Sequence, residues 1–191
     1  SFTVPNPQLW DVEAPNLYTA AVKIVSEDFT DISKIRFGIR TIKFTGNDGF
    51  HLNGRRVQIY GVNLHSDLGP LGMAFNRSAA KRQLDVMKEM GVNAIRTSHN
   101  ACDPQMLDLC DEMGIIVWNE CFDKWTGTAG KLPEQNLEEY VEKNLLAFVR
   151  RDRNHPSVVA WSIGNEIPPS KKDGMTAARF RRFRAAMRTL D

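Results

Sequence analysis

The sequence predicts an α/β fold: the first half of a TIM (β/α)8 barrel, made of four βα units, with a few strands of a β-sandwich before it. Three observations lead to this fold class. From residue 57 onward, strand-like apolar runs and helix-like segments alternate four times, and consecutive units of this kind form a parallel sheet through right-handed crossovers. Polar residues end all four expected strands, where a barrel collects its active site. The first strand-to-helix loop contains no GxGxxG motif, so we favour the barrel over the competing architecture, an open doubly wound sheet.

The chain before residue 44 has a different pattern of apolar and polar residues. Residues 17–26 and 32–44 alternate apolar and polar side chains, which is the pattern of half-exposed strands. Two or three antiparallel strands do not form a stable sandwich alone, so residues 1–43 are expected to be part of a larger β domain. Asn53 and Gly54 then mark a tight hairpin turn.

Helix-capping signals delimit the βα units. Asn76 and Gly91 begin and end the first helix, while Asp103 caps the second and Gly114 follows its last turn. The expected strands are residues 57–65, 92–99, 115–120 and 157–166, and the expected helices are residues 76–91, 103–114, 137–150 and 174–190.

The composition disfavours several kinds of partner. A net charge of +2 over 191 residues gives no broad basic field, so nucleic acid is not expected as a partner. No apolar run reaches 18 residues, so no membrane span is expected. The spacing of the three cysteines fits neither a disulfide framework nor a CxxC site, and we interpret Cys102, Cys110 and Cys121 as packing residues. The arginines of the last helix are expected to form a solvated face: Arg179, Arg181, Arg182, Arg184 and Arg188.

The fourth expected strand begins as apolar as a buried core strand and ends in an amide and a carboxylate. Strict alternation places Glu166 on the inner face of the barrel, at its mouth, and directs Trp161, Ile163 and Asn165 toward the helices. A carboxyl group that is partly desolvated there stays protonated near neutral pH and can donate to a leaving oxygen. The alternative is a structural carboxylate paired with a neighbouring arginine.

The chain carries a series of motifs in a fixed order: "LW" with "PNLY", "RFGIRTI", "GFHLNG", "GVNLHSDLG", "NAIRTSHN", "LDLCDEMGIIVWNE" and "RRDRNHPSVVAWSIGNE". Together they cover nearly the whole chain and resemble glycoside hydrolase family 2, most closely its β-galactosidase branch. In that family a sugar-binding β domain and an immunoglobulin-like domain precede a catalytic barrel. The resemblance implies that residues 1–43 end the immunoglobulin-like domain and that residues 44–191 form the first half of the barrel. The chain would then be a piece of a longer protein.

The resemblance also implies roles for the last strand. Glu166 of "GNE" would be the general acid/base of a retaining exo-β-glycosidase, most closely a β-galactosidase, and Asn165 would bind the 2-hydroxyl of the sugar. The family's nucleophile is a second glutamate on a later strand, and nothing in this chain corresponds to it. Glu120 would shape the site without acting as the nucleophile. We therefore expect the isolated chain to be inactive.

Other polar residues at the strand ends are candidates for substrate contact. His65 lies in the "GVNLH" match, and His99 and Asn100 lie in "TSHN"; a satisfied buried histidine is the alternative for each imidazole. Asp67 would contact substrate or cap a turn, and Trp125 would stack on a sugar or pack in the core.

Arg96 is expected to point inward, like Ala94 and Ser98 on the same strand. It would orient the missing nucleophile and keep it ionised. A structural ion pair with Glu120 or Asp123 is the other interpretation.

The expected partner is a carbohydrate. Some family members use a metal near the acid/base, but "NECFDKWTG" does not reproduce that loop, so no metal and no other cofactor is assigned. Relatives favour a periplasmic or secreted location over the cytoplasm. The open edges of a four-stranded sheet predict self-association. The competing functions are β-glucuronidase, β-mannosidase and a non-catalytic sugar-binding or assembly module.

Overall fold

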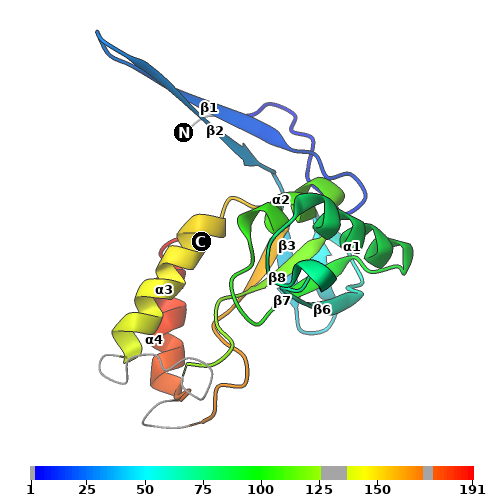
Figure 1. The fold of residues 1–191 in the computed structure, drawn as a ribbon, viewed down its shortest axis with the longest axis vertical. Coiled ribbons are helices and arrows are strands. Elements are labelled where there is room, and N and C mark those ends of the chain that lie inside the picture. The colour runs from blue at the N-terminus through cyan, green and yellow to red at the C-terminus, as the bar shows by residue number, and fades with distance from the viewer. Residues whose placement is uncertain (1–2, 126–136, 170–173) are drawn as a thin grey trace.

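The computed structural model describes residues 3–125, 137–169 and 174–191. Within these residues the chain forms three separate sheets and four α-helices (Figure 1). The β-strands are β1 (Tyr18–Val25), β2 (Thr30–Phe37), β3 (Ile42–Thr45), β4 (Gly49–Leu52), β5 (Arg55–Arg56), β6 (Gly61–His65), β7 (Ala94–Ser98), β8 (Ile116–Glu120) and β9 (Val158–Ser162). The helices are α1 (Arg77–Glu89), α2 (Pro104–Met113), α3 (Leu137–Asp152) and α4 (Ala177–Met187), with a 3-10 turn, η1 (Gly69–Leu71), before α1.

The central sheet is parallel and has the strand order β6-β7-β8-β9. Each strand pairs with the next one along the chain, which is the order of a barrel and confirms the four predicted βα units. The register brings the side chains of one inner row together, because Asn63 pairs with Arg96, Arg96 with Trp118, and Trp118 with Ala160. The carboxyl ends of all four strands therefore meet at one edge of the sheet.

The outer face of this sheet packs against the helices. Leu64, Ile95 and Val117 form one buried cluster with Leu84 of α1 and Leu107 of α2. Burial of such apolar side chains away from water is the main favourable term in folding. The predicted caps hold both helices in place: Asn76 Oδ1 accepts from the Ala79 amide at 3.0 Å, and Asp103 Oδ1 accepts from the Gln105 amide at 2.9 Å.

The amino end of the sheet is closed by the three-stranded antiparallel sheet β3-β4-β5. Phe50 and Leu52 of β4 form a buried cluster with Ala94 and Ile116, the first residues of β7 and β8. The hairpin predicted between β4 and β5 is confirmed, because Asn53 and Gly54 have φ angles of 53° and 79°, as a type I′ turn requires. The open end of the sheet is thus the carboxyl end.

The β1–β2 hairpin extends away from the rest of the chain (Figure 1). The two strands pair antiparallel from Tyr18↔Phe37 to Val25↔Thr30, as the alternating pattern predicts, and they precede the barrel units as strands of a sandwich domain. The domain boundary at residues 43 and 44 stays a prediction. β3, which begins at Ile42, pairs with β4 and not with β2.

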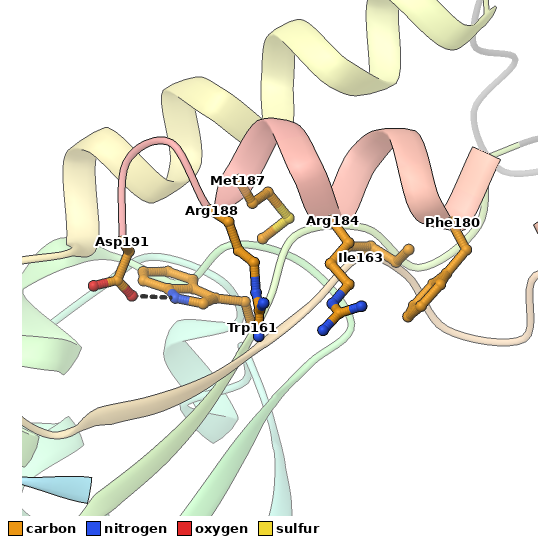
Figure 2. A pocket seen from close by; sticks show the side chains of 7 residues that line it. All are labelled: Trp161, Ile163, Phe180, Arg184, Met187, Arg188 and Asp191. Carbon is orange, nitrogen blue, oxygen red and sulfur yellow. Dashed lines mark hydrogen bonds between the residues drawn. The ribbon is translucent and has the colours of Figure 1, made fainter. Parts of the chain in front are cut away.

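Helix α4 lies beside α3 and covers the end of β9. Arg182 lies on a solvated face as expected, with its side chain 45% exposed, and its Nε donates to Glu142 Oε2 of α3 at 2.6 Å. Arg179 departs from the expectation, because its side chain is only 12% exposed and its Nε donates to Glu138 Oε1 at 2.9 Å. Figure 2 shows the groove between α4 and β9, which is lined by Trp161, Ile163, Phe180, Arg184, Met187, Arg188 and Asp191. Trp161 and Ile163 face the helices, as alternation predicts.

The three cysteines are buried packing residues, as predicted. Burial raises the pKa of the Cys102 and Cys121 thiols to about 12, so neither is a nucleophile near neutral pH. No helix in the described ranges is long and apolar enough to cross a membrane.

Candidate active site

Glu166 stands just beyond β9, on a turn and not within the strand. β9 ends at Ser162, and Glu166 has a φ of 49°, a conformation that is uncommon for a residue with a Cβ. Its side chain is 73% exposed, and Oε2 lies 3.0 Å from Lys124 Nζ. The carboxyl group is thus exposed among the described residues, and its partial desolvation in a complete barrel stays a prediction.

The turn begins at Gly164. A Cβ at this position would lie 2.8 Å from Ile167 Cδ1 and 3.3 Å from Trp125 Nε1, which is too close for any other residue without movement of its neighbours. Trp125 Nε1 also donates to the Ile163 carbonyl at 2.9 Å. These contacts fix the path by which the chain leaves β9 and presents Glu166.

Asn165 points into the site, which corrects the assignment made from alternation. The alternation of strand side chains stops at Ser162, so Asn165 is free to face the central sheet. Its Oδ1 accepts from Arg96 Nη2 at 2.9 Å, and its Nδ2 donates to Asp123 Oδ1 at 3.0 Å. This hydrogen bond is the main reason that the pKa of Asp123 lies below its ordinary value, and Lys124 acts in the same direction. The amide therefore has a fixed orientation.

Glu120 is the buried centre of the site, with a side chain that is 1% exposed. Arg96 Nη2 donates to Glu120 Oε2 at 2.8 Å, and Ser162 Oγ donates to the same oxygen at 2.6 Å. The other oxygen, Oε1, lies 2.7 Å from His99 Nδ1. Of the two interpretations of Arg96, the structure therefore contains the ion pair, and its partner is Glu120.

The contact with Glu120 orients the ring of His99. A carboxylate oxygen is an acceptor, so His99 Nδ1 donates to Glu120, and Nε2 is the ring nitrogen left for another partner. The ring of His65 meets the ring of His99 edge to face, with centroids 5.1 Å apart. Together the two imidazoles line the same side of the sheet edge.

The remaining candidates divide into exposed and buried residues. Asn100 is exposed and follows His99 directly. Asp67 caps a turn, because its Oδ1 accepts from the Gly69 amide at 2.8 Å, which is one of the two roles expected for it. Trp125 is 1% exposed and packs edge to face on Phe183 at 5.3 Å. Of the two roles expected for Trp125, the structure therefore contains packing in the core and not a sugar-stacking wall.

Two features of the site were not predicted from the sequence, Lys124 and the hydrogen bond of Ser162. Lys124 Nζ lies 3.0 Å from Glu166 and 3.2 Å from Asp123, and the two carboxylates raise the pKa of the lysine. No spacing rule could reveal this bridge, since it joins the loop after β8 to the turn after β9. Ser162, in contrast, lies four residues before Glu166, so strand alternation puts it on the same inner face; its partner Glu120 comes from the neighbouring strand.

A second cluster of titratable groups lies at the amino end of the sheet. His155 Nδ1 is 2.6 Å from Asp111 Oδ2, and atoms of Asp108, Asp111 and His155 that could ligate a metal lie within 4.8 Å of one another. Arg36 binds Asp108 at 2.7 Å, and the Ser157 amide donates to Asp111 at 3.1 Å. Ion pairs and hydrogen bonds thus account for this cluster without a metal, as a structural clamp before β9.

Comparison with known proteins gives a consistent result. The model of glycosyl hydrolases family 2, TIM barrel domain, matches residues 42–191, and a second family 2 model matches residues 1–40. A β-galactosidase from Bacteroides ovatus is 49% identical over 168 residues, which cover 86% of this chain and 20% of that protein. The chain therefore spans about a fifth of the length of this relative.

Solved structures agree with the sequence comparison. A β-glycosidase from Bacteroides vulgatus superposes with a TM-score of 0.87 at 36% identity, over 97% of this chain and 24% of that one. A β-glucuronidase from Parabacteroides merdae superposes with a TM-score of 0.79 at 32% identity, over 98% of this chain and 23% of that one. Both sugar specificities are thus represented among similar proteins.

Proposed function

The chain belongs to glycosyl hydrolase family 2, and from this premise we propose that it carries the acid/base half of the active site of a retaining exo-β-glycosidase. Glu166 would protonate the glycosidic oxygen and then deprotonate the water that releases the sugar. The observation that carries the proposal is the position of Glu166, exposed at the carboxyl end of the sheet beside the network of Asn165, Arg96 and Glu120. Exposure gives a leaving oxygen and a water molecule access to the carboxyl group.

The neighbouring groups would bind the sugar. The amide of Asn165 is oriented by Arg96 and Asp123, which supports a contact with the 2-hydroxyl that strengthens as positive charge develops on the sugar ring. Nε2 of His99 would accept a hydrogen bond from a sugar hydroxyl, since Nδ1 already binds Glu120. His65 adjoins it and would bind a further hydroxyl.

The nucleophile would be a second carboxylate roughly 5 Å from Glu166, which is the separation that retaining enzymes use. Glu120 does not suit this role, because it is buried and binds Arg96, His99 and Ser162. We place the nucleophile on a strand beyond these 191 residues, in keeping with the fifth of the relative's length that the chain spans.

A neutral sugar suits the charges of the described site. Its two cations, Arg96 and Lys124, are each paired with carboxylates, so neither is free to bind a uronate. This supports a β-galactoside as the substrate. A β-glucuronidase is the second candidate, and the likeness to the Parabacteroides merdae enzyme favours it.

Sugar release from an aryl β-galactoside and an aryl β-glucuronide tests the proposal. The assay compares this chain with a longer protein in which the barrel is complete. We expect turnover of the galactoside by the longer protein alone, and a loss of roughly 10²–10⁴-fold with Glu166→Gln. Glu139→Gln, a change at an exposed glutamate of α3, is the matched control.

Three other outcomes of this assay would change the assignment. Turnover by the chain alone would show that the catalytic pair lies within it. Turnover of the glucuronide alone would select the second candidate. A folded longer protein that cleaves neither substrate would contradict the proposal and leave a sugar-binding or assembly module.

A further inference from the structure

We propose that a cavity between the first two strand-to-helix loops binds a second, neutral sugar unit of the substrate, next to the unit held at Glu166. The proposal rests on the proposed function and adds a subsite to it. The cavity has a volume of about 390 Å³, which is within the range of small-molecule sites. It lies between the loop after β6 and the loop after β7, and Gln83 of α1 and Arg151 of α3 reach its wall.

The walls combine apolar surface with acceptors. Leu68, Met73 and Phe75 supply the apolar part, and Met73 is 82% exposed, so its thioether is available to a ligand. Sugar units present C–H faces together with hydroxyl groups, and a pocket that is largely apolar with a few placed polar atoms matches both.

Gln83 supplies an acceptor that lacks a partner. Its Oε1 is buried and has no hydrogen bond to any of the described residues. Nε2 lies 3.5 Å from the carbonyl oxygen of Asp67, and because only the amino group can donate to that oxygen, Oε1 is the atom left without a partner. A buried acceptor without a donor is uncommon in folded proteins. A sugar hydroxyl in the cavity would supply the donor.

The charges around the cavity favour a neutral ligand. Asp67 and Asp103 both line it, and each gives one oxygen to a backbone amide, at Gly69 and Gln105. The guanidinium of Arg151, which also lines the cavity, is bound to Asp152 at 2.6 Å. An anionic sugar would therefore meet two carboxylates and an arginine that is already paired.

His65 joins the cavity to the candidate active site. This residue lines the cavity, and its ring meets that of His99, which lies 2.7 Å from Glu120. In the proposed arrangement one sugar unit lies beside His99 and the next beside Gln83, on the two sides of His65.

The test is a titration of this chain, labelled with ¹³C at the methionine methyl groups and followed by NMR. The probes are a neutral β-galactosyl disaccharide, methyl β-galactoside, and a disaccharide that carries a uronic acid. We expect the methyl signal of Met73 to shift with the neutral disaccharide and much less with the other two. Met90, which is 73% exposed and lies outside the cavity, is the internal control.

Substitutions make the test specific. Gln83→Leu removes the unpartnered acceptor and should weaken disaccharide binding about tenfold, the effect of one good hydrogen bond. Gln105→Leu, at an exposed glutamine of α2, should leave it unchanged. A Met73 signal that does not move with the neutral disaccharide, that moves equally with methyl β-galactoside, or that moves most with the uronic acid would overturn the proposal.

Activity separates this proposal from the proposed function. In a longer protein with a complete barrel, Gln83→Leu should lower kcat/KM for the disaccharide about tenfold more than kcat/KM for the aryl β-galactoside, whose aryl group offers no hydroxyl to Gln83. Equal losses on both substrates would contradict the subsite. A protein that cleaves neither substrate would contradict the proposed function, while the NMR titration would still decide whether the cavity binds the neutral disaccharide.

Discussion

Glu120 and Asp111 are two buried carboxylates at opposite ends of the same parallel sheet, and each contacts a histidine. The distance is 2.7 Å from Glu120 to His99 and 2.6 Å from Asp111 to His155. At the amino end, the second oxygen of Asp111 binds the amide of Ser157, which is fully buried. At the carboxyl end, the partners of Glu120 remain partly exposed, with Arg96 at 30% and His99 at 22%.

The comparison shows that the contact itself does not distinguish a structural pair from a functional one. At Asp111 one partner, the Ser157 amide, is fully buried, and the other, His155, is 16% exposed; both join the segment before β9 to α2. At Glu120 the partners have further hydrogen-bonding groups that face the open end of the sheet. One of these already continues to Asn165, the neighbour of Glu166. Four predictions separate the two ends, and the largest effect is expected at the amino end.

Asp111→Ala should lower the free energy of unfolding by about 3–5 kcal/mol, because it leaves the largely covered His155 ring, which is 16% exposed, and the buried Ser157 amide without their partner. Urea unfolding measures the loss. Asp85→Ala, which breaks an exposed pair with Lys81 on α1, is the control and should cost no more than about 0.5 kcal/mol.

Glu120→Ala should lower the free energy of unfolding by about 1–3 kcal/mol, less than Asp111→Ala, because water can reach Arg96 and His99 once the carboxylate is gone. Sugar binding should nevertheless be lost, since both partners lose their orientation. Urea unfolding measures the loss of stability. The ring resonances of His99, followed by NMR while a galactoside is added, measure the loss of sugar binding. Equal destabilisation by the two substitutions would contradict the contrast drawn between the two ends.

Stability should also depend on pH at the amino end. Burial lowers the pKa of His155, but the hydrogen bond and charge of Asp111 outweigh it, and the pKa lies above its ordinary value of 6.5. A raised pKa in the folded state means that the stabilisation is complete below pH 6.5 and declines as pH rises through the folded value. The difference in unfolding free energy between the unsubstituted chain and His155→Gln should shrink accordingly. A difference that grows with pH would refute this sign.

The smallest effect on stability is expected at Lys124, which is exposed and bridges Asp123 and Glu166. Lys124→Ala should leave urea unfolding unchanged. In a longer protein with a complete barrel, Lys124→Ala should lower kcat/KM for an aryl β-galactoside, because the Glu166 carboxylate loses the ammonium group that holds it in place. Lys124→Arg, which keeps a cation beside Glu166, should restore most of the activity. Equal kcat/KM values in all three proteins would assign Lys124 no part in the reaction.

The features that were predicted correctly from the sequence are those whose determining interactions are local. The caps at Asn76 and Asp103 involve residues two or three positions away, so the residue type and its position predict them. The βα order and the gathering of polar strand ends likewise depend on periodicity within each segment. Arg96 is intermediate, because its inward direction follows from its strand, while the choice of Glu120 as partner needs the neighbouring strand.

The errors arise where distant segments decide the path of the chain. The turn at Gly164 depends on its close approach to Ile167 and Trp125, so alternation misplaced Asn165 and Glu166 beyond the end of β9. Trp125 is buried because Phe183 of α4 packs on it. The two residues lie far apart in the sequence, so no local pattern predicts their contact.

The central claim is that Glu166 acts as the acid/base, and the dependence on the leaving group tests it most directly. In the longer protein, kcat/KM of Glu166→Gln is compared with that of Glu139→Gln on two aryl β-galactosides, one with a poor leaving group and one with a highly acidic phenol. We expect kcat/KM to fall roughly 10²–10⁴-fold on the substrate with the poor leaving group. The fall should be much smaller on the substrate with the acidic phenol, which departs without protonation. Equal losses on both substrates, or no loss on either, would show that Glu166 does not donate the proton.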